Sequence, residues 1–160
     1  MPDMLVKLYD LPDPSAYRDA MAEAGVVIRH AMPYERSAAR RWIEGRFNEK
    51  WADEFEAAFA HQPATGLLAI REGVIVGFAC YEATARGFFG PTGVDESERG
   101  RGIGAALLIE ALHALRGLGY GYGIIGGVGP AAFYAKHVGA TVIEGSDPGV
   151  YRHRLRQQSE

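Results

Sequence analysis

Three glycines alternate with other residues just before a strongly apolar helical pattern, in the stretch ERGRGIGAALL at residues 98–108. The first turn of a helix carries unpaired backbone N–H groups and the positive end of the helix dipole. Glycines let a bulky anion approach those donors closely, and Arg99 and Arg101 add positive charge. This stretch therefore predicts a phosphate-binding site.

Two common phosphate motifs compete for this stretch. The nucleotide P-loop is excluded, because the chain contains no Gly-Lys-Ser or Gly-Lys-Thr. The dinucleotide pattern GxGxxA is met by Gly100, Gly102 and Ala105. That motif should directly follow a strand and precede an acidic residue by about 20 positions. Here the polar DESER precedes it, and residues 117–129 contain no acid, so the dinucleotide interpretation is disfavoured.

The glycine stretch is similar to the acyl-CoA loop of the GNAT acetyltransferase superfamily. The pattern of that loop, R/Q-x-x-G-x-G/A, is met here by Arg99, Gly102 and Gly104. A strand ending in Val-x-Pro usually comes before the loop, and this chain has Glu96 at the proline position. The resemblance covers roughly residues 26–155 and leaves residues 1–25 as an additional segment.

A second resemblance to the superfamily lies about 30 residues later, in AAFYAKHVGA at residues 131–140. Its pattern A-x-x-F-Y-x-K-x-G-F is met by Phe133 and Tyr134, although one extra residue precedes Gly139 and Ala140 replaces an aromatic residue. The loop and the Phe-Tyr helix together identify the chain as resembling a CoA-dependent N-acetyltransferase. The resemblance implies acetyl-CoA as cosubstrate, no metal, and a primary amine of a small molecule or peptide as acceptor.

The resemblance also implies which residues meet the cofactor. The family's pantetheine arm pairs with the strand before the loop, and its pyrophosphate sits on the loop and the start of the helix. The expected cofactor-binding residues are Thr92, Gly93, Val94, Arg99, Gly100, Arg101, Gly102, Ile103, Gly104, Ala105 and Phe133.

The catalytic residues are assigned by the chemistry of acyl transfer. A backbone N–H within residues 92–94 would polarise the thioester carbonyl, and Tyr134 is the candidate acid that protonates the thiolate. Glu82 is the first candidate base, with Asp95 and Glu96 as alternatives. Because no base is obvious, a non-catalytic acyl-CoA sensor or partner-binding domain is the alternative function.

The elements that must position these residues are read from periodicity and turn signals. Strands are expected at residues 4–9, 26–32 and 86–94, in a hairpin within 65–83, at 119–129, and in a last hairpin of 141–145 and 149–156. Helices are expected at residues 14–25, 34–47, 49–61, 102–117 and 130–139. Gly90 and Pro91 should distort the strand at 86–94.

This order predicts an α/β (α+β) fold with a mixed, mostly antiparallel sheet of about seven strands flanked by helices. The resemblance implies a GNAT-like single domain over residues 1–160, splayed between the strand before the loop and the strand after its helix. Residues 1–25 would add an N-terminal strand and helix.

Composition restricts the partners. The 160 residues carry a net charge of -3 and one cysteine, which disfavours nucleic-acid binding and excludes an intrachain disulfide. No apolar run approaches the roughly 20 residues of a membrane helix, and no signal peptide is evident. We therefore expect a cytoplasmic protein without a membrane partner. Exposed strand edges make a homodimer reasonable.

Overall fold

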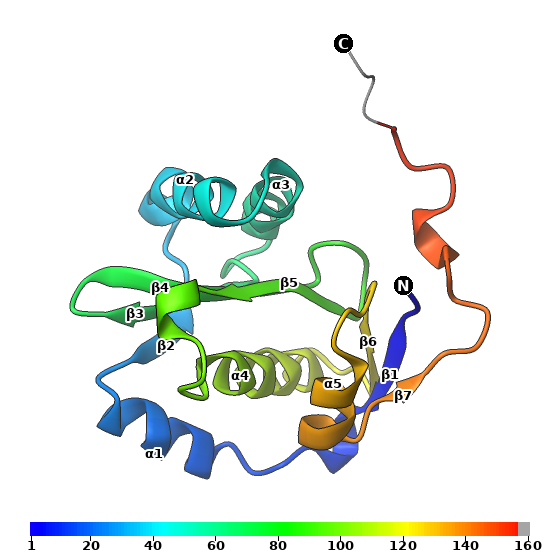
Figure 1. The fold of residues 1–160 in the computed structure, drawn as a ribbon, viewed down its shortest axis with the longest axis horizontal. Helices are drawn as coiled ribbons and strands as arrows, with labels where there is room; N and C mark the ends of the chain where they lie inside the picture. Colours follow the sequence, from blue (N-terminus) through cyan, green and yellow to red (C-terminus); the bar gives the residue numbers. More distant parts are fainter. Residues whose placement is uncertain (157–160) are drawn as a thin grey trace.

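The central element is a seven-stranded sheet in the order β2-β3-β4-β5-β6-β1-β7 (Figure 1). The computed structural model describes residues 1–156. The strands are β1 (Met4–Lys7), β2 (Val27–His30), β3 (Gly66–Arg71), β4 (Val74–Tyr81), β5 (Phe88–Val94), β6 (Tyr122–Ile125) and β7 (Thr141–Val142). Every neighbouring pair is antiparallel except β5 and β6, which are parallel. The predicted mixed, mostly antiparallel sheet is confirmed.

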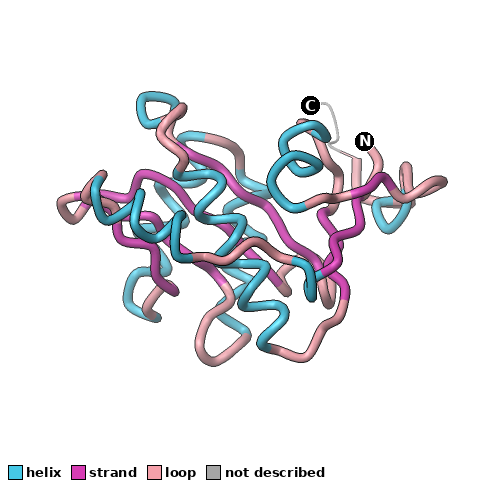
Figure 2. Tube along the Cα trace, turned by 90° about the horizontal axis from the view of Figure 1, so that it is seen from below, coloured by secondary structure: helices cyan, strands magenta, loops and turns pink. Residues whose placement is uncertain are grey.

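Helices cover both faces of the sheet. They are α1 (Ser15–Glu23), α2 (Arg36–Arg46), α3 (Glu49–Ala57), α4 (Ile103–Gly117) and α5 (Ala131–Val138). Figure 1 shows α2 and α3 above the sheet and α1, α4 and α5 below it. Figure 2 shows the same layers from below, with helices lying across the strands. The predicted helices are present, each shorter than expected by one to four residues in total.

Helix α4 is the centre of the lower layer because its sequence is apolar nearly all round. A helix of this kind is stable only when other elements surround it. Nine of its residues are buried, namely Ile103, Ala105, Ala106, Leu107, Leu108, Ile109, Ala111, Leu112 and Leu115. The helix packs on β4 and β5 and is covered by α1. This packing fixes the N-terminal end of α4 against the end of β5.

An aromatic cluster holds α2 and α3 on the upper face. Phe78 of β4 is fully buried, and its ring lies 5.7–6.4 Å from those of Trp42, Phe47, Trp51 and Phe55. Such edge-on and tilted contacts add to the stabilisation from burial. Phe55 and Phe78 are both fully buried, so this cluster forms the core of the upper layer.

The N-terminal segment is built into the sheet. Strand β1 pairs antiparallel with β6 on one side and with β7 on the other. Val6 of β1 is fully buried, and Met21 of α1 packs into the same core. Residues 1–25 therefore supply the predicted strand and helix, and the strand takes an interior position.

The predicted C-terminal hairpin is wrong. Only Thr141–Val142 of the expected strand 141–145 forms a strand, and Gly149–Tyr151 forms a 3-10 turn where the strand 149–156 was expected. Strand β7 pairs with β1 at the edge of the sheet and ends at Val142, and no strand is added beyond it within residues 1–156. Gly145 and Gly149 also adopt positive φ angles of 76° and 54°, which turn the chain away from extended geometry.

Candidate active site

The gap between β5 and β6 begins two residues into their pairing. Phe88 pairs with Ile124 and Phe89 pairs with Ile125, and no further pair follows. The edge of residues 90–94 that faces β6 is therefore unpaired. Unpaired strand edges carry free N–H and C=O groups that an extended ligand can pair with. The predicted splay is confirmed at this place.

Strand β5 is irregular where the gap opens. Its pairing with β4 shifts register between Ala79, which faces Thr92, and Tyr81, which faces Phe89. One extra residue is therefore accommodated around Gly90, whose φ is 114°. A bulge of this kind re-aims the neighbouring groups of a strand. The distortion predicted from Gly90 and Pro91 is confirmed.

A glycine loop follows β5 and leads into α4. Gly100 and Gly102 adopt φ angles of 80° and 82°. No side chain caps the helix, and the amides of residues 100–105 donate to no acceptor within residues 1–156. Unpaired amides at a helix start, together with the helix dipole, favour a bound anion. The chain thus presents a row of free donors beside the unpaired edge of β5.

The glycines of this loop leave open space. A Cβ atom added at Gly100 would meet nothing within 4 Å, and one at Gly102 would meet only Met21 at 4.0 Å. Gly104 has no positive φ, and a Cβ there would lie 3.7 Å from Val94, an ordinary contact. Neither backbone geometry nor packing therefore requires glycine at position 104, although glycine weakens a helix.

Gly104→Ala is expected to raise thermal stability and weaken CoA binding. Alanine favours the helix by about 0.5–1 kcal/mol, whereas its methyl group would occupy the space next to the free amides. Thermal denaturation and calorimetric titration with CoA measure the two effects. Gly117→Ala at the other end of α4 is the matched control, since a Cβ there meets nothing within 4 Å. Equal CoA affinity in both variants would contradict a ligand at Gly104.

Two arginines of the loop are exposed beside the free amides. Arg99 donates from Nε to the carbonyl oxygen of Val94 at 3.3 Å. The Arg101 side chain is 53% exposed, with Nη1 3.3 Å from Oε2 of Glu98. Glu98 itself is buried and accepts a hydrogen bond from Arg71 of β3. The Arg71–Glu98 pair ties the loop to the β3–β4 hairpin, and no local sequence signal indicated it.

Asp95 organises the start of the loop. Its carboxylate accepts from the Ser97 backbone N–H at 3.0 Å and from Arg46 Nε of α2 at 2.6 Å. The hydrogen bond from Arg46, followed by those from Ser97, lowers the pKa of Asp95 to about 2. A carboxylate with so low a pKa is a weak base, which disfavours Asp95 as the catalytic base.

Removing the arginine should be visible in the titration of Asp95. We expect Arg46→Ala to raise the pKa of Asp95 toward the ordinary aspartate value of about 3.9. The pKa of Asp95 is lower in the folded protein than in the unfolded chain. The ion pair therefore stabilises the fold fully at pH values above the unfolded-chain pKa, and this stabilisation is lost as pH falls toward about 2. NMR titration of the carboxyl carbon measures the pKa, with exposed Arg41→Ala as control. An unchanged pKa in Arg46→Ala would contradict the ion pair.

Tyr134 of α5 lies where the gap begins. Its ring packs 6.3 Å from that of Phe89, the last β5 residue paired with β6. The side chain is 7% exposed, and burial raises the pKa of its phenol. The phenol therefore stays protonated at neutral pH and is able to donate a proton. Its role as the acid remains a prediction.

The other expected cofactor residues lie around the same gap. The Thr92 hydroxyl donates to the Phe78 carbonyl oxygen at 3.0 Å. A Cβ at Gly93 would lie 2.5 Å from the Phe47 ring, so this close contact requires glycine. Val94 packs against the core around α4, where Ile103 and Ala105 are buried. The ring centroids of Phe133 and His137 are 4.6 Å apart.

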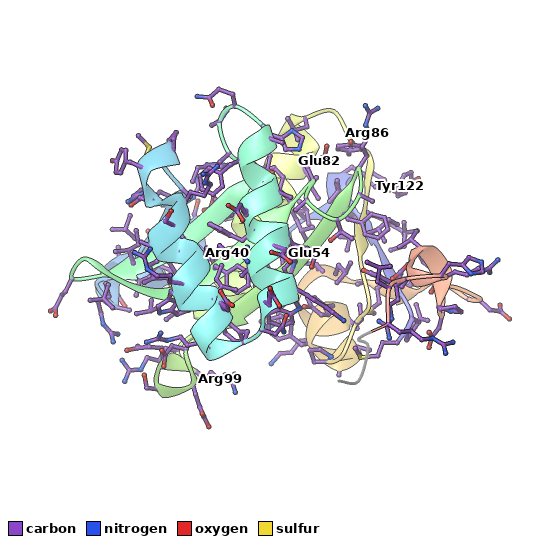
Figure 3. The ribbon with its side chains drawn as sticks, turned by 90° about the horizontal axis from the view of Figure 1, so that it is seen from above. Arg40, Glu54, Glu82, Arg86, Arg99 and Tyr122 are labelled. Atoms are coloured by element: carbon purple, nitrogen blue, oxygen red, sulfur yellow. The ribbon has the colours of Figure 1, made fainter. Side chains whose placement is uncertain are left out.

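Glu82 lies at the other end of β5 from the loop. Its carboxylate accepts hydrogen bonds from the Gly87 backbone N–H and, at 3.1 Å, from the Tyr120 hydroxyl. These bonds close the turn between β4 and β5, where Glu82 has a φ of 60°. Figure 3 shows Glu82 and Arg99 on opposite sides of the molecule. The role of Glu82 as the base remains a prediction. The alternative base Glu96 is exposed in a short 3-10 turn.

Comparison with known proteins shows to which family this chain belongs. A family model described as "Acetyltransferase (GNAT) family" matches residues 31–140, more than half of the chain. The chain belongs to the GNAT acetyltransferase family. A comparison with curated proteins finds no match.

Solved structures of GNAT proteins share the fold. A GCN5-related N-acetyltransferase from Sphaerobacter thermophilus aligns with a TM-score of 0.67 and 25% identity, over 89% of this chain and 48% of its own. A GCN5-related N-acetyltransferase from Kribbella flavida aligns with a TM-score of 0.53 and 26% identity, over 78% of this chain and 46% of its own. A fungal multi-domain β-N-acetylglucosaminidase contains a glucosamine N-acetyltransferase region. It aligns with a TM-score of 0.73 and 16% identity, over 89% of this chain and 19% of its own. This chain spans less than half the length of each.

One groove of this GNAT chain lies outside the expected site. A shallow groove of about 380 Å³ lies between α1, β2 and α4, and none of the expected site residues lines it. Within residues 1–156, no group of three or more His, Cys, Asp and Glu side chains is arranged to hold a metal ion. None of the helices in that range is long and apolar enough to cross a membrane.

Proposed function

We propose that the protein transfers an acetyl group from acetyl-CoA to a primary amine of a small molecule or peptide. One observation carries this proposal: the free amides of residues 100–105 lie directly beyond the unpaired edge of β5. A CoA molecule combines a diphosphate with an extended, amide-containing arm, so it matches both features. Membership of an acetyltransferase family supports the same reaction.

The chemistry proposed for the site follows from these positions. The free amides, Arg99 and Arg101 bind the pyrophosphate, and the pantetheine arm pairs along residues 90–94. The thioester then lies near Phe89, beside Tyr134. The amine nitrogen forms a bond to the acetyl carbon and loses a proton, which Glu82 takes directly or through water. The C–S bond breaks, and Tyr134 donates a proton to the leaving thiolate. Holding both reactants in this geometry supplies a large part of the rate.

Calorimetric titration with CoA, followed by thiol release from acetyl-CoA with a panel of amines, tests the proposal. Submillimolar CoA binding and saturable turnover support it. Absence of CoA binding contradicts it. Binding without turnover would instead support a non-catalytic acyl-CoA sensor, a function favoured by the engagement of Glu82 in the turn.

A further inference from the structure

Glu98 is a buried carboxylate in the loop that carries the free amides. It ends the short 3-10 turn Glu96–Glu98, and its side chain is 11% exposed. One of its oxygens, Oε1, accepts a hydrogen bond from Nη2 of Arg71 at the end of β3. Burying a carboxylate is unfavourable unless a positive charge compensates it. Arg71 supplies this compensation, because it pairs with Glu98 across the two elements.

The other oxygen of Glu98 faces Arg101. The distance from Oε2 of Glu98 to Nη1 of Arg101 is 3.3 Å, which is within the range of an ion pair. Oε2 is nevertheless a buried atom without a hydrogen-bond partner in residues 1–156, so this contact lacks hydrogen-bond geometry. The guanidinium of Arg101 is therefore close to Glu98 without being bound by it. Arg101 itself lies between Gly100 and Gly102, whose amides are free.

The three side chains together carry one net positive charge. While Arg71 neutralises Glu98, that positive charge belongs to Arg101, the most exposed of the three. Without Arg71, the buried carboxylate of Glu98 would have Arg101 as its remaining ion-pair partner. Opposite charges attract more strongly where water is partly excluded. Arg101 would then be drawn onto Glu98, and the net charge of the group beside the free amides would fall to zero.

The position of the loop does not depend on the Arg71–Glu98 pair alone. Strand β3 pairs with β4 up to Arg71 and Val74, so the hairpin holds Arg71 in place. The loop is joined to β4 separately, because the Asp95 backbone N–H donates to the Val76 carbonyl oxygen at 2.9 Å. We therefore expect the backbone of the loop to keep its place when the charge of Arg71 or Glu98 is removed.

We propose that Arg71 is a positioning residue for CoA binding: by neutralising Glu98, it leaves Arg101 free to bind the diphosphate. This inference rests on the proposed function. Glu98 acts in the opposite direction, because its carboxylate competes with the diphosphate for Arg101. The two partners of one ion pair therefore have opposite effects on CoA affinity. A pair with a merely structural role would affect CoA affinity in the same direction whichever partner is changed.

Calorimetric titration of Arg71→Met and Glu98→Gln with CoA tests this assignment. We expect Arg71→Met to weaken CoA binding about tenfold, the magnitude of one charge-assisted hydrogen bond. Glu98→Gln should bind CoA more tightly than the wild type, because no carboxylate then attracts Arg101. Both variants should lose thermal stability, since both remove the same ion pair. The double variant Arg71→Met/Glu98→Gln should recover the wild-type CoA affinity without recovering the stability.

Arg40→Met is the matched control. The Arg40 side chain is 25% exposed, against 26% for Arg71, and it pairs with Asp53 and Glu56 of α3. It lies in the upper helical layer, on the other side of the sheet from α4. This change also removes an ion-paired arginine, and it should leave CoA affinity unchanged. Arg71→Lys keeps the positive charge and should bind CoA with close to the wild-type affinity.

The outcomes separate this inference from the proposed function. Unchanged or weaker CoA binding by Glu98→Gln overturns the inference, as does wild-type affinity in Arg71→Met. In both cases, CoA binding and turnover by the wild type leave the proposed function intact. If Arg71→Met does not fold, the CoA affinity of Glu98→Gln decides alone. A wild type that binds no CoA contradicts both proposals.

Discussion

Gly102→Val is expected to weaken CoA binding at least about 100-fold, the largest effect on affinity of any change considered. Gly102 is the N-cap residue of α4 and has a φ of 82°, and a Cβ there would meet only Met21, at 4.0 Å. A valine would place two methyl groups where the diphosphate must approach the free amides. A 100-fold loss of affinity corresponds to about 2.7 kcal/mol of binding free energy. The loss of several charge-assisted hydrogen bonds to the diphosphate exceeds this value. Calorimetric titration with CoA measures it.

The strain of a side chain at positive φ must be separated from the loss of the ligand site. A non-glycine residue there costs about 1–2 kcal/mol. Gly119→Val, just past the other end of α4, is the control, because Gly119 has a φ of 101° and open space. Both variants should lose similar thermal stability, and only Gly102→Val should lose CoA. Near wild-type affinity in a folded Gly102→Val protein would disprove the loop assignment.

Tyr134→Phe is expected to lower kcat about 100-fold or more, within the usual range for removal of a general acid. The change deletes one oxygen and keeps the ring contacts with Phe89 and Phe133. CoA affinity and folding should therefore be unchanged. Because burial raises the pKa of Tyr134, the alkaline decline in wild-type activity should lie above the ordinary tyrosine value of about 10. The variant should lack that decline.

Steady-state rates of thiol release across pH provide the measurement for Tyr134. Exposed Tyr34→Phe serves as the control for loss of a phenol elsewhere on the surface. A Tyr134→Phe protein with the wild-type kcat and pH profile would remove the phenol from the mechanism. The leaving thiolate would then take its proton from water.

The parts of the site that sequence alone indicated are those encoded by local signals. Glycine spacing before an apolar run located the loop and the start of α4. Gly90-Pro91 inside a strand pattern located the bulge. Pro130 and Gly139 framed the helix that carries Tyr134. Each signal acts through neighbouring residues, so it can be interpreted without knowing the rest of the structure.

The parts that were missed depend on residues far apart in the chain. Arg46 with Asp95, Arg71 with Glu98, and Thr84 with Glu54 join elements that only the folded sheet brings together. None of these side chains has a type or spacing that distinguishes it from an ordinary polar or charged surface residue. The place of β7 is also set at long range, because it pairs with β1 at the edge of the sheet, and strand propensity in residues 141–156 does not reveal that pairing.

The interior place of β1 has a consequence for how the chain folds during synthesis. Residues 66–117 supply β3, β4, β5 and α4 in sequence. We therefore expect this part to pair early, because its contacts are local. Strand β1 is made first, yet its partners at residues 122–125 and 141–142 emerge more than a hundred residues later. Pairings of such long range are slow. The half of the sheet beyond the gap should therefore be the last to form.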